Sequence, residues 1–343
     1  MVDELAKAEA EITSWISRSR TIESVNRLPG DASARRYYRV QTRKPEVKTY
    51  VLMRTEPFVQ EGMELPFIVV QKHLANAAVS VPSILDVDPA KGYILLEDLG
   101  DVTLLRYLQD VISADVERHL YERVIDSLVN LQVYASPKRN PAEIEAYKLC
   151  FDLEKLMWEV GFTVEHFYDG YLKRKIKEAD RKTILEGFNE ICTELALQPT
   201  VFTHRDFHSR NVMVTEPKKR LVMIDFQDAR MGPQQYDLAS LLKDSYYQLE
   251  ESQVERLIDY YIARWEAETK ERLDRGKFRY IFDLMSIQRN FKAIGSFASF
   301  LNKRGDPSYL KFIGNTFENI RRSFLKYPKY SHLREVLFHY YYF

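Results

Sequence analysis

The stretch T-H-R-D-F-H-S-R-N at residues 203–211, with L-V-M-I-D-F shortly after it at residues 221–226, decides the fold. The chain between these stretches is predicted to form a β-hairpin, because apolar residues flank the polar, turn-like segment T-E-P-K-K-R at residues 215–220. Such a hairpin would place Asn211 and Asp225 side by side at one end. The pattern therefore predicts a site rich in oxygen atoms, built from a loop and the hairpin that follows it.

Three side chains of this stretch have the chemistry that transfer of a phosphoryl group requires. Asp206 can accept a proton from the hydroxyl group of a substrate. Asn211 and Asp225 offer the hard oxygen atoms that Mg²⁺ prefers, and Mg²⁺ bridges the phosphates of ATP. Each residue alone would read as an ordinary turn or strand-end residue, but their order favours a phosphotransferase site. We predict Asp206 as the catalytic residue, Asn211 and Asp225 as metal ligands, and ATP and Mg²⁺ as the cofactors.

The loop also resembles the catalytic loops of known kinases. It follows the protein-kinase pattern H-R-D-L-x-x-x-N, and His208 makes it more similar to the H-x-D-x-H-x-x-N loop of the aminoglycoside phosphotransferase and choline kinase superfamily. Members of that superfamily are kinase-fold enzymes that act on small molecules. Protein kinases usually have Lys at the position of His208 and Gly at the position of Gln227, so an activation-loop switch of the protein-kinase type is not expected here.

The resemblance implies an α+β, protein-kinase-like two-lobe fold. Residues 1–98 would form a small N-terminal lobe around an antiparallel sheet and bind the nucleotide. Residues 99–343 would form a large, mostly helical C-terminal lobe for catalysis and substrate binding. Apolar patterns agree with this division: they predict strands at residues 23–28, 36–40, 49–54, 82–87 and 93–96, and helices at residues 3–19, 62–74, 116–133, 144–160, 180–197, 236–242 and 283–297.

The turn between the first two predicted strands has the features of a phosphate-covering loop. Gly30 allows close approach of the backbone, and Ser33 can donate hydrogen bonds from its N–H and hydroxyl groups to phosphate. We predict Gly30, Asp31 and Ser33 as nucleotide-binding residues. The resemblance further implies that the backbone at Glu97 and Leu99, in the segment that links the lobes, meets the edge of the adenine ring.

The third predicted strand, residues 49–54, lacks the Lys that kinases usually have there for binding phosphate. We predict that Arg54, at the end of this strand, takes that role, because a guanidinium group suits phosphate recognition. Lys48 and the loop residue Arg35 are alternatives. A solvated Arg54 at the strand end is an equally open interpretation.

Three further stretches narrow the resemblance: G-D-A-S-A-R-R-Y-Y-R-V at residues 30–40, I-D-F-Q-D-A-R-M-G-P at residues 224–233 and Q-R-N-F-K-A-I-G-S-F at residues 288–297. Together they are similar to anomeric sugar kinases, which phosphorylate N-acetylmuramate and N-acetylglucosamine at C1 in bacterial cell-wall recycling. The similarity covers most of the chain and implies sugar α-1-phosphates as products. Asp237 resembles the structural Asp of the superfamily, which steadies the catalytic loop by hydrogen bonding.

We predict five substrate-binding residues on the acceptor side of the site: His208, Gln227, Asp228, Arg289 and Lys292. Residues just beyond Asp225 can hydrogen-bond sugar hydroxyl groups through an amide and a carboxylate. Arg289 and Lys292 share one face of the predicted helix at residues 283–297. If that helix faces the site, the pair can bind the lactyl carboxylate of N-acetylmuramate; otherwise both are solvated surface charges.

Composition limits the classes of protein to consider. The 343 residues include 50 Lys and Arg and 50 Asp and Glu, and this balance argues against a general nucleic-acid binder. Cys150 and Cys192 lack metal-ligand spacing and suit a reducing compartment. The chain has no apolar run of about 18 residues and no signal-peptide segment. We expect a cytoplasmic enzyme with a small-molecule sugar substrate and no membrane span, and the oligomeric state stays open.

Two other functions are open at the level of sequence. The first is an aminoglycoside or other amino-alcohol phosphotransferase of the same fold, although Arg289 and Lys292 suit an anionic or acetamido sugar better than a cationic acceptor. The second is a catalytically inactive, nucleotide-binding scaffold, which the missing third-strand Lys would support. The presence of Asp206, Asn211 and Asp225 together argues against a scaffold.

Overall fold

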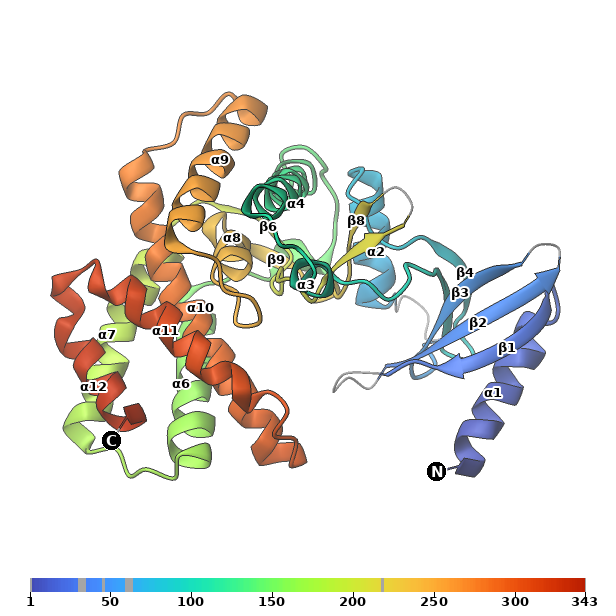
Figure 1. Ribbon diagram of the computed structural model, residues 1–343, viewed down its shortest axis with the longest axis horizontal. Coiled ribbons are helices and arrows are strands. Elements are labelled where there is room, and N and C mark those ends of the chain that lie inside the picture. The colour runs from blue at the N-terminus through green and yellow to red at the C-terminus, as the bar shows by residue number, and fades with distance from the viewer. Residues whose placement is uncertain (1, 30–34, 45–46, 59–63, 217–218, 343) are drawn as a thin grey trace.

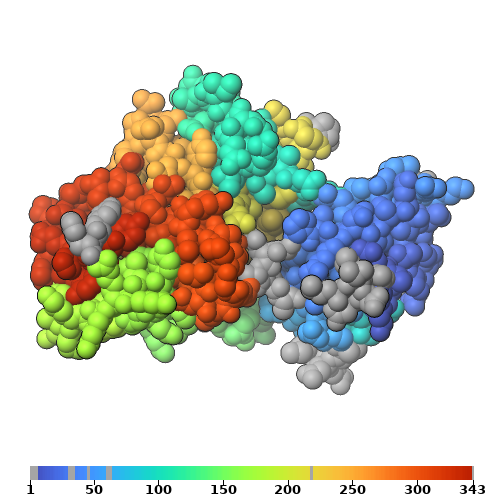
Figure 2. All heavy atoms as spheres, turned by 60° about the horizontal axis from the view of Figure 1, so that its bottom comes forward, coloured from blue at the N-terminus to red at the C-terminus, as the bar shows by residue number. Residues whose placement is uncertain are grey.

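The computed structural model describes residues 2–29, 35–44, 47–58, 64–216 and 219–342 of the chain. An antiparallel sheet with one flanking helix, α1 (Val2–Ile16), forms one end of the molecule, and a group of helices forms the other end (Figure 1). In the space-filling view, the first end is blue, and the other end is mainly red and yellow-green (Figure 2). The two-lobe α+β fold expected from the sequence is confirmed.

The strands are β1 (Thr21–Arg27), β2 (Arg36–Lys44), β3 (Lys48–Arg54), β4 (Ile84–Asp88), β5 (Tyr93–Glu97), β6 (Thr200–Thr203), β7 (Val212–Thr215), β8 (Arg220–Met223) and β9 (Arg230–Pro233). The further helices are α2 (Pro66–Asn76), α3 (Leu104–Gln109), α4 (Ala114–Tyr134), α5 (Glu145–Lys148), α6 (Leu153–Thr163), η1 (Val164–Tyr171), α7 (Glu178–Ala196), α8 (Gln235–Leu242), α9 (Glu251–Thr269), α10 (Arg275–Arg304), η2 (Leu310–Phe312), α11 (Ile313–Leu325), η3 (Pro328–Tyr330) and α12 (Ser331–Tyr342). None of these described helices has both the length and the apolar character that a membrane span needs.

The N-terminal sheet has the strand order β1-β2-β3-β5-β4, and all neighbouring strands are antiparallel. Side chains alternate between the two faces of each strand. On one face, Tyr50 and Leu52 of β3 pack against Ile12 and Trp15 of α1 in a small core of their own. The other face carries Val51 and is turned towards the second lobe. The sheet therefore has one face covered by a helix and one face that can form a cleft.

Helix α2 connects the two lobes. Its residue Phe67 stacks on Phe226, which follows strand β8, with the ring centroids 5.0 Å apart. The backbone amide of Met223 in β8 donates a hydrogen bond to the carbonyl of Ser80, at 2.9 Å. These contacts hold the end of β8 against the N-terminal lobe.

Helix α10, with 30 residues, is the centre of the C-terminal lobe and packs against α6, α7, α8 and α11. Asp274 caps its start by accepting a hydrogen bond from the amide of Lys277, and Gly305, with a φ of 69°, ends it in the left-handed conformation. At Gly295, a Cβ atom would lie 2.7 Å from the Cα atom of Thr163. A residue without a side chain is therefore needed where α10 crosses the end of α6.

Two short pairs of strands frame the catalytic loop. Strand β6 ends at Thr203 and pairs with β9, and strand β7 begins at Val212 and pairs with β8. The loop at residues 204–211 therefore leaves one strand pair and enters the other, so both of its ends are fixed. The β7–β8 hairpin predicted from the sequence is confirmed.

One predicted helix is wrong. Residues 144–160 do not form a continuous helix, because the chain leaves α5 at Lys148 and runs alongside β9 before α6 begins. The amide of Phe151 donates a hydrogen bond to the carbonyl of Met231, at 3.0 Å, and its ring stacks on Tyr236. These contacts between distant segments outweigh the helical pattern, since they satisfy the backbone and bury an aromatic ring.

Candidate active site

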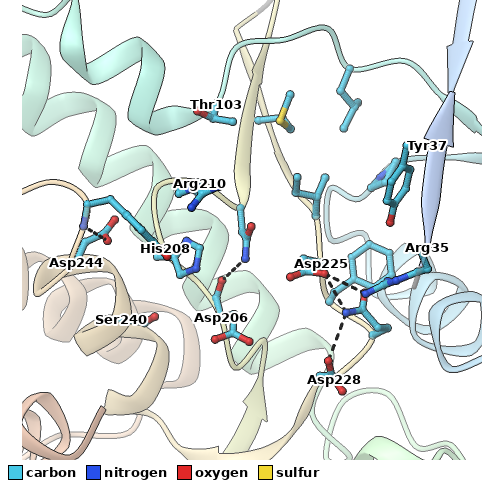
Figure 3. Close-up of a pocket in the computed structure, with 18 of the residues that line it drawn as sticks. Arg35, Tyr37, Thr103, Asp206, His208, Arg210, Asp225, Asp228, Ser240 and Asp244 are labelled. Carbon is cyan, nitrogen blue, oxygen red and sulfur yellow. Dashed lines mark hydrogen bonds and ion pairs between the residues drawn. The ribbon is translucent and has the colours of Figure 1, made fainter. Parts of the chain in front are cut away.

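A cavity of about 830 Å³ lies between the lobes. Its walls come from the cleft face of the sheet, from the linker after β5, from the catalytic loop, from the end of the β7–β8 hairpin and from α10. It is lined by most of the residues predicted from the sequence: Glu97, Leu99, Asp206, His208, Asn211, Asp225, Gln227, Asp228, Arg289 and Lys292. Figure 3 shows how Asp206, His208, Asp225 and Asp228 converge on this space. The structure thus brings the predicted catalytic, metal-binding and acceptor residues together.

The catalytic loop is held by Asp237 of α8. The carboxylate of Asp237 accepts hydrogen bonds from the backbone amides of His204, at 2.7 Å, and Arg205, at 3.0 Å. Arg205 has a φ of 80°, which is strained for a residue with a side chain, and the two hydrogen bonds offset this strain. Burial raises the pKa of Asp237 to about 7, although both hydrogen bonds favour the ionised form. The hydrogen-bonding role that the resemblance implied for Asp237 is confirmed.

A second buried carboxylate, Asp244, holds the other half of the loop. It accepts hydrogen bonds from the amide and the hydroxyl group of Ser209, at 2.9 and 2.5 Å. The amide of Tyr246 donates to its other oxygen atom, at 2.9 Å. Asp244 was not predicted from the sequence, because it lies beyond the end of α8 and its contact with Ser209 joins segments that are distant in the chain.

Asp206 lies beside two cations of α10. Its Oδ1 atom is 3.2 Å from Nη2 of Arg289 and 3.4 Å from Nζ of Lys292. Burial would raise the pKa of Asp206, but the charges of Lys292, Arg289 and Arg205 outweigh burial and hold this pKa far below its usual range. Asp206 is therefore ionised at neutral pH and can orient a substrate hydroxyl group.

Helix α10 turns Arg289 and Lys292 into the cavity, as the carboxylate-binding hypothesis requires. Arg289 is only 7% exposed and also donates a hydrogen bond to the hydroxyl group of Ser240, at 3.0 Å. Burial lowers the pKa of Lys292, although the charge of Asp206 opposes this shift. The interpretation of both residues as solvated surface charges is wrong. Their contact with Asp206 was not predicted.

Asn211 and Asp225 meet at the end of the hairpin. The amide of Ile224 donates a hydrogen bond to the carbonyl of Asn211, at 3.0 Å, and so holds the two segments together. The side-chain nitrogen of Asn211 donates to the carbonyl of Asp206, at 2.9 Å, so its side-chain oxygen is the atom that can bind a metal. Asp225 has a φ of 66°, and its side chain is 46% exposed.

The oxygen atoms of this pair fit Mg²⁺. Among the residues that the structure describes, no group of three or more His, Cys, Asp or Glu side chains could hold a metal ion on its own. Mg²⁺ usually binds one or two carboxylates and completes its shell with phosphate oxygens and water. A carboxylate and an amide oxygen on the cavity wall match that pattern, whereas zinc prefers nitrogen and sulfur ligands.

Two polar side chains, those of Arg35 and Gln227, contact Asp225 (Figure 3). Nη2 of Arg35 lies 3.4 Å from its Oδ1 atom, and the side-chain amide of Gln227 donates to the same atom at 2.9 Å. Asp228 accepts a weaker hydrogen bond from Gln227 and pairs with Arg205, both at 3.4 Å. The two predicted acceptor-side residues therefore lie directly beside the predicted metal ligand.

His208 is an uncharged residue of the cavity wall. Its ring packs on that of Tyr246, with the centroids 5.1 Å apart. Burial lowers the pKa of His208 to about 3, so the ring is neutral at physiological pH. Its Nδ1 atom is buried without a hydrogen-bond partner among the described residues. A buried polar atom of this kind is a candidate contact for a bound substrate.

Apart from Arg54, the predicted nucleotide-binding residues have two different outcomes. Gly30, Asp31 and Ser33 lie outside the described residues. Glu97 and Leu99 line the cavity. The carboxylate of Glu97 contacts Arg220 and Ser83, and its backbone amide donates a hydrogen bond to the carbonyl of Ser83, at 3.0 Å, so its backbone carbonyl is the group that can meet a nucleotide.

The structure contradicts the assignment of Arg54. Its guanidinium group pairs with Glu11 of α1, at 3.4 Å, and lies 5.8 Å from the ring centroid of Tyr93. Because side chains alternate along β3, Arg54 shares the face of Tyr50 and Leu52, which α1 covers. Arg54 is thus directed away from the cavity.

Arg39 of β2 was not predicted from the sequence. Its guanidinium group donates to both carboxylate oxygens of Asp98, at 2.8 and 3.1 Å, and pairs with Asp101 at 2.9 Å. Burial would raise the pKa of Asp98, but the hydrogen bonds from Arg39 and Gly100 lower it. This bidentate pair ties the sheet to the linker at the cavity.

The chain is similar in sequence to known phosphotransferases. The family model described as "Phosphotransferase enzyme family" matches residues 24–274. Over 315 residues, the chain is 32% identical to an N-acetylmuramate/N-acetylglucosamine kinase from Pseudomonas aeruginosa, with 90% of this chain and 86% of that protein covered. A protein of the same name from Neisseria meningitidis is 30% identical, with 90% of this chain and 87% of that protein covered.

The fold is similar to that of a choline/ethanolamine kinase family protein from Mesorhizobium loti. The TM-score is 0.64 at 14% sequence identity, with 97% of this chain and 98% of that chain covered. At this identity the likeness concerns the fold alone. The family model and the sequence relatives each match most of the chain, so the chain belongs to the phosphotransferase enzyme family.

Proposed function

We propose that the protein is an ATP- and Mg²⁺-dependent cytoplasmic kinase that phosphorylates the anomeric hydroxyl group of N-acetylmuramate, N-acetylglucosamine or both. The observation that carries the proposal is the presence of Asp206, Asn211 and Asp225 on the wall of one cavity. The curated relatives, which are named N-acetylmuramate/N-acetylglucosamine kinases, supply the class of acceptor.

On the nucleotide side, adenine would lie against the linker, with the backbone at Glu97 and Leu99 on its polar edge. Val51 of the sheet and Ile224 of the hairpin line the cavity and offer apolar surface to the two faces of the ring. Mg²⁺ would neutralise charge on the phosphate oxygens. Asn211 and Asp225 would be its protein ligands.

On the acceptor side, the sugar would lie between Asp206 and an aromatic wall formed by Tyr246, Phe297 and Tyr309. Asp206 would accept a hydrogen bond from the anomeric hydroxyl group and then take its proton, while the oxygen bonds to the γ-phosphorus and the bond to ADP breaks. Phosphoryl transfer has a loose transition state, which asks for little basicity. Alignment of the hydroxyl group would be the main contribution of Asp206.

The charge on the acceptor side supports a neutral or anionic substrate. Arg210, Arg289 and Lys292 all line this part of the cavity. A cationic aminoglycoside would be repelled by them, although Asp206 offsets part of the charge. A lactyl carboxylate would be attracted, and an acetamido group can accept hydrogen bonds from the same side chains.

A panel of acceptors tests the proposal. Release of ADP would be followed with N-acetylmuramate, N-acetylglucosamine, glucosamine and kanamycin, using the wild type and Asp206→Asn. We expect turnover with at least one N-acetylated sugar in the wild type alone. Turnover with kanamycin only would show that the protein is a kinase but would reject an N-acetylated sugar as its acceptor. Binding of ATP without turnover of any acceptor would instead support the inactive scaffold.

A further inference from the structure

The sheet offers no cation from β3 to the phosphates of ATP. Val51 of β3 lines the cavity opposite Arg39 of β2. Met53, the next residue on the same face, pairs with Tyr37 and is fully buried in the apolar core. The position on β3 from which a side chain could reach phosphate is therefore occupied by the uncharged side chain of Met53.

The other basic residues of β3 are directed elsewhere. Arg54 contacts Glu11 and Tyr93 on the covered face of the sheet. Lys48 lies over the ring of Tyr50, with Nζ 5.8 Å from the centroid, also on that face. Neither residue lines the cavity.

Two cations of the described N-terminal lobe line the cavity, Arg35 and Arg39. The residues of this lobe that the structure does not describe include no Lys or Arg. Arg39 is held at the linker by Asp98 and Asp101, on the side of the adenine ring. Arg35, just before β2, lies instead at the far end of the cavity, beside Asp225 (Figure 3).

We propose that Arg35 is the residue that binds the phosphates of ATP in place of a β3 Lys, and that it exchanges Asp225 for phosphate when nucleotide binds. This inference rests on the proposed function. The contact of 3.4 Å joins a partly exposed guanidinium group to a carboxylate that is also the predicted metal ligand. Arg35 and Mg²⁺ would therefore compete for the same oxygen atoms, and a metal ion on Asp225 would release Arg35 to the phosphates.

The exchange is energetically easy. A partly exposed ion pair of this length, with side chains 20% and 46% exposed, contributes little to stability, because solvent and salt screen it. A guanidinium group can instead form two parallel hydrogen bonds to a phosphate group, which are stronger. The contact of Arg35 with Asp225 would thus be replaced by a stronger contact with phosphate, without any change in the fold.

Calorimetric titration with ATP, ADP and adenosine tests the first part. Arg35→Met should weaken binding of ATP and ADP on the order of 10- to 100-fold, as expected for one charge-assisted contact, and leave adenosine binding unchanged. Arg35→Lys should keep part of the affinity. The matched control Arg54→Met removes the other candidate cation and should leave all three affinities unchanged. Loss of ATP affinity in Arg54→Met but not in Arg35→Met would overturn the proposal.

A double-mutant cycle in the absence of Mg²⁺ tests the exchange. Asp225→Asn should tighten binding of metal-free ATP, because it removes repulsion and also releases Arg35. The gain should be about two- to fivefold greater in the wild-type background than in Arg35→Met, where no pair has to be broken. Equal gains in both backgrounds would mean that the pair persists and would overturn the exchange. If the folded wild type binds no adenine nucleotide at all, the proposed function itself fails. This result differs from the two results that would overturn the role of Arg35 or its exchange.

Discussion

At the scale of single residues, the charge state of Asp206 determines what the site can do. Lys292 and Arg289 hold the pKa of this carboxyl far below its usual range, even though burial acts in the opposite direction. A carboxyl group whose pKa is lower in the folded protein than in the unfolded chain stabilises the fold at pH values above its unfolded pKa of about 4. This stabilisation is lost as the pH falls from about 4 to the folded pKa. Titration of Asp206 should therefore change neither stability nor activity between about pH 5 and 8.

Replacing Asp206 by Asn should abolish turnover. The amide keeps the shape of the side chain but no longer offers a carboxylate that aligns the acceptor hydroxyl group and takes its proton, a loss on the order of 10²- to 10⁴-fold. ATP affinity should stay within a few-fold, because Asp206 lies on the acceptor side. Steady-state kinetics with ATP titration by calorimetry measures both quantities. Turnover close to that of the wild type would remove Asp206 from the mechanism.

Asp237 should give stability a pH dependence of its own. Burial raises the pKa of Asp237 to about 7, whereas it is about 4 in an unfolded chain. The folded protein then keeps a proton that the unfolded chain has lost, so the stability contributed by this group is lost as pH rises from about 4 through 7. The Tm of the wild type, measured relative to Asp237→Asn, should decline from pH 5 to pH 8. A constant difference in Tm would contradict the raised pKa.

Arg289 and Lys292 should differ in their effects, although both contact Asp206. Arg289 joins Asp206 to Ser240, so Arg289→Met should lower kcat for both N-acetylated sugars. Lys292→Met should lower kcat/KM for N-acetylmuramate about tenfold more than for N-acetylglucosamine, because only the former carries a carboxylate. Equal losses for the two sugars in Lys292→Met would reject carboxylate recognition by this residue.

At the scale of elements, the β7–β8 hairpin is the part that creates a metal site. It joins Asn211 to the segment of Asp225, and neither residue alone would hold Mg²⁺. Asp225→Ala should therefore weaken binding of Mg-ATP by an order of magnitude or more, while binding of metal-free ATP tightens. Titrations with Mg²⁺ and with a chelator provide the comparison. Equal weakening under both conditions would point to a purely structural Asp225.

The hairpin and the five sheet strands could be predicted because their signals are local. Alternating apolar residues and turn residues lie within a few positions of one another, and the pairing partners follow directly in the chain except for β3 and β5, which have α2 and β4 between them. The helix expected at residues 144–160 fails for the opposite reason. Its break depends on contacts of Phe151 with Met231 and Tyr236, which are distant in sequence.

The site residues also divide into those with a local signal in the sequence and those that depend on distant segments. Asp206, Asn211 and Asp225 belong to one compact pattern, so their order was readable without a structure. Arg54 failed because alternation gives the residues that share a face but does not say which face is covered by α1. Asp244 and Arg39 lie outside this pattern and hold the catalytic loop and the linker in place. Their contacts depend on tertiary packing and could not be assigned from the sequence.

At the scale of the whole molecule, we propose that the boundary between the lobes lies after Asp98. Strand β5 ends at Glu97, and the next helix, α3, begins at Leu104. Two contacts join the N-terminal lobe to consecutive residues after β8: the apolar stack of Phe67 on Phe226 and the polar pair of Arg35 with Asp225. The first would persist when nucleotide binds, and the second is the one that our proposal expects to change.

The account predicts one particular product, and phosphorus NMR of the reaction mixture tests it most directly. With Mg-ATP and N-acetylglucosamine or N-acetylmuramate, the wild type should form a new phosphate ester whose signal couples to the anomeric proton, with α configuration at C1. Asp206→Asn should form none under the same conditions. A phosphate on another hydroxyl group of the sugar, or no sugar phosphate from an enzyme that binds ATP, would contradict the central claim.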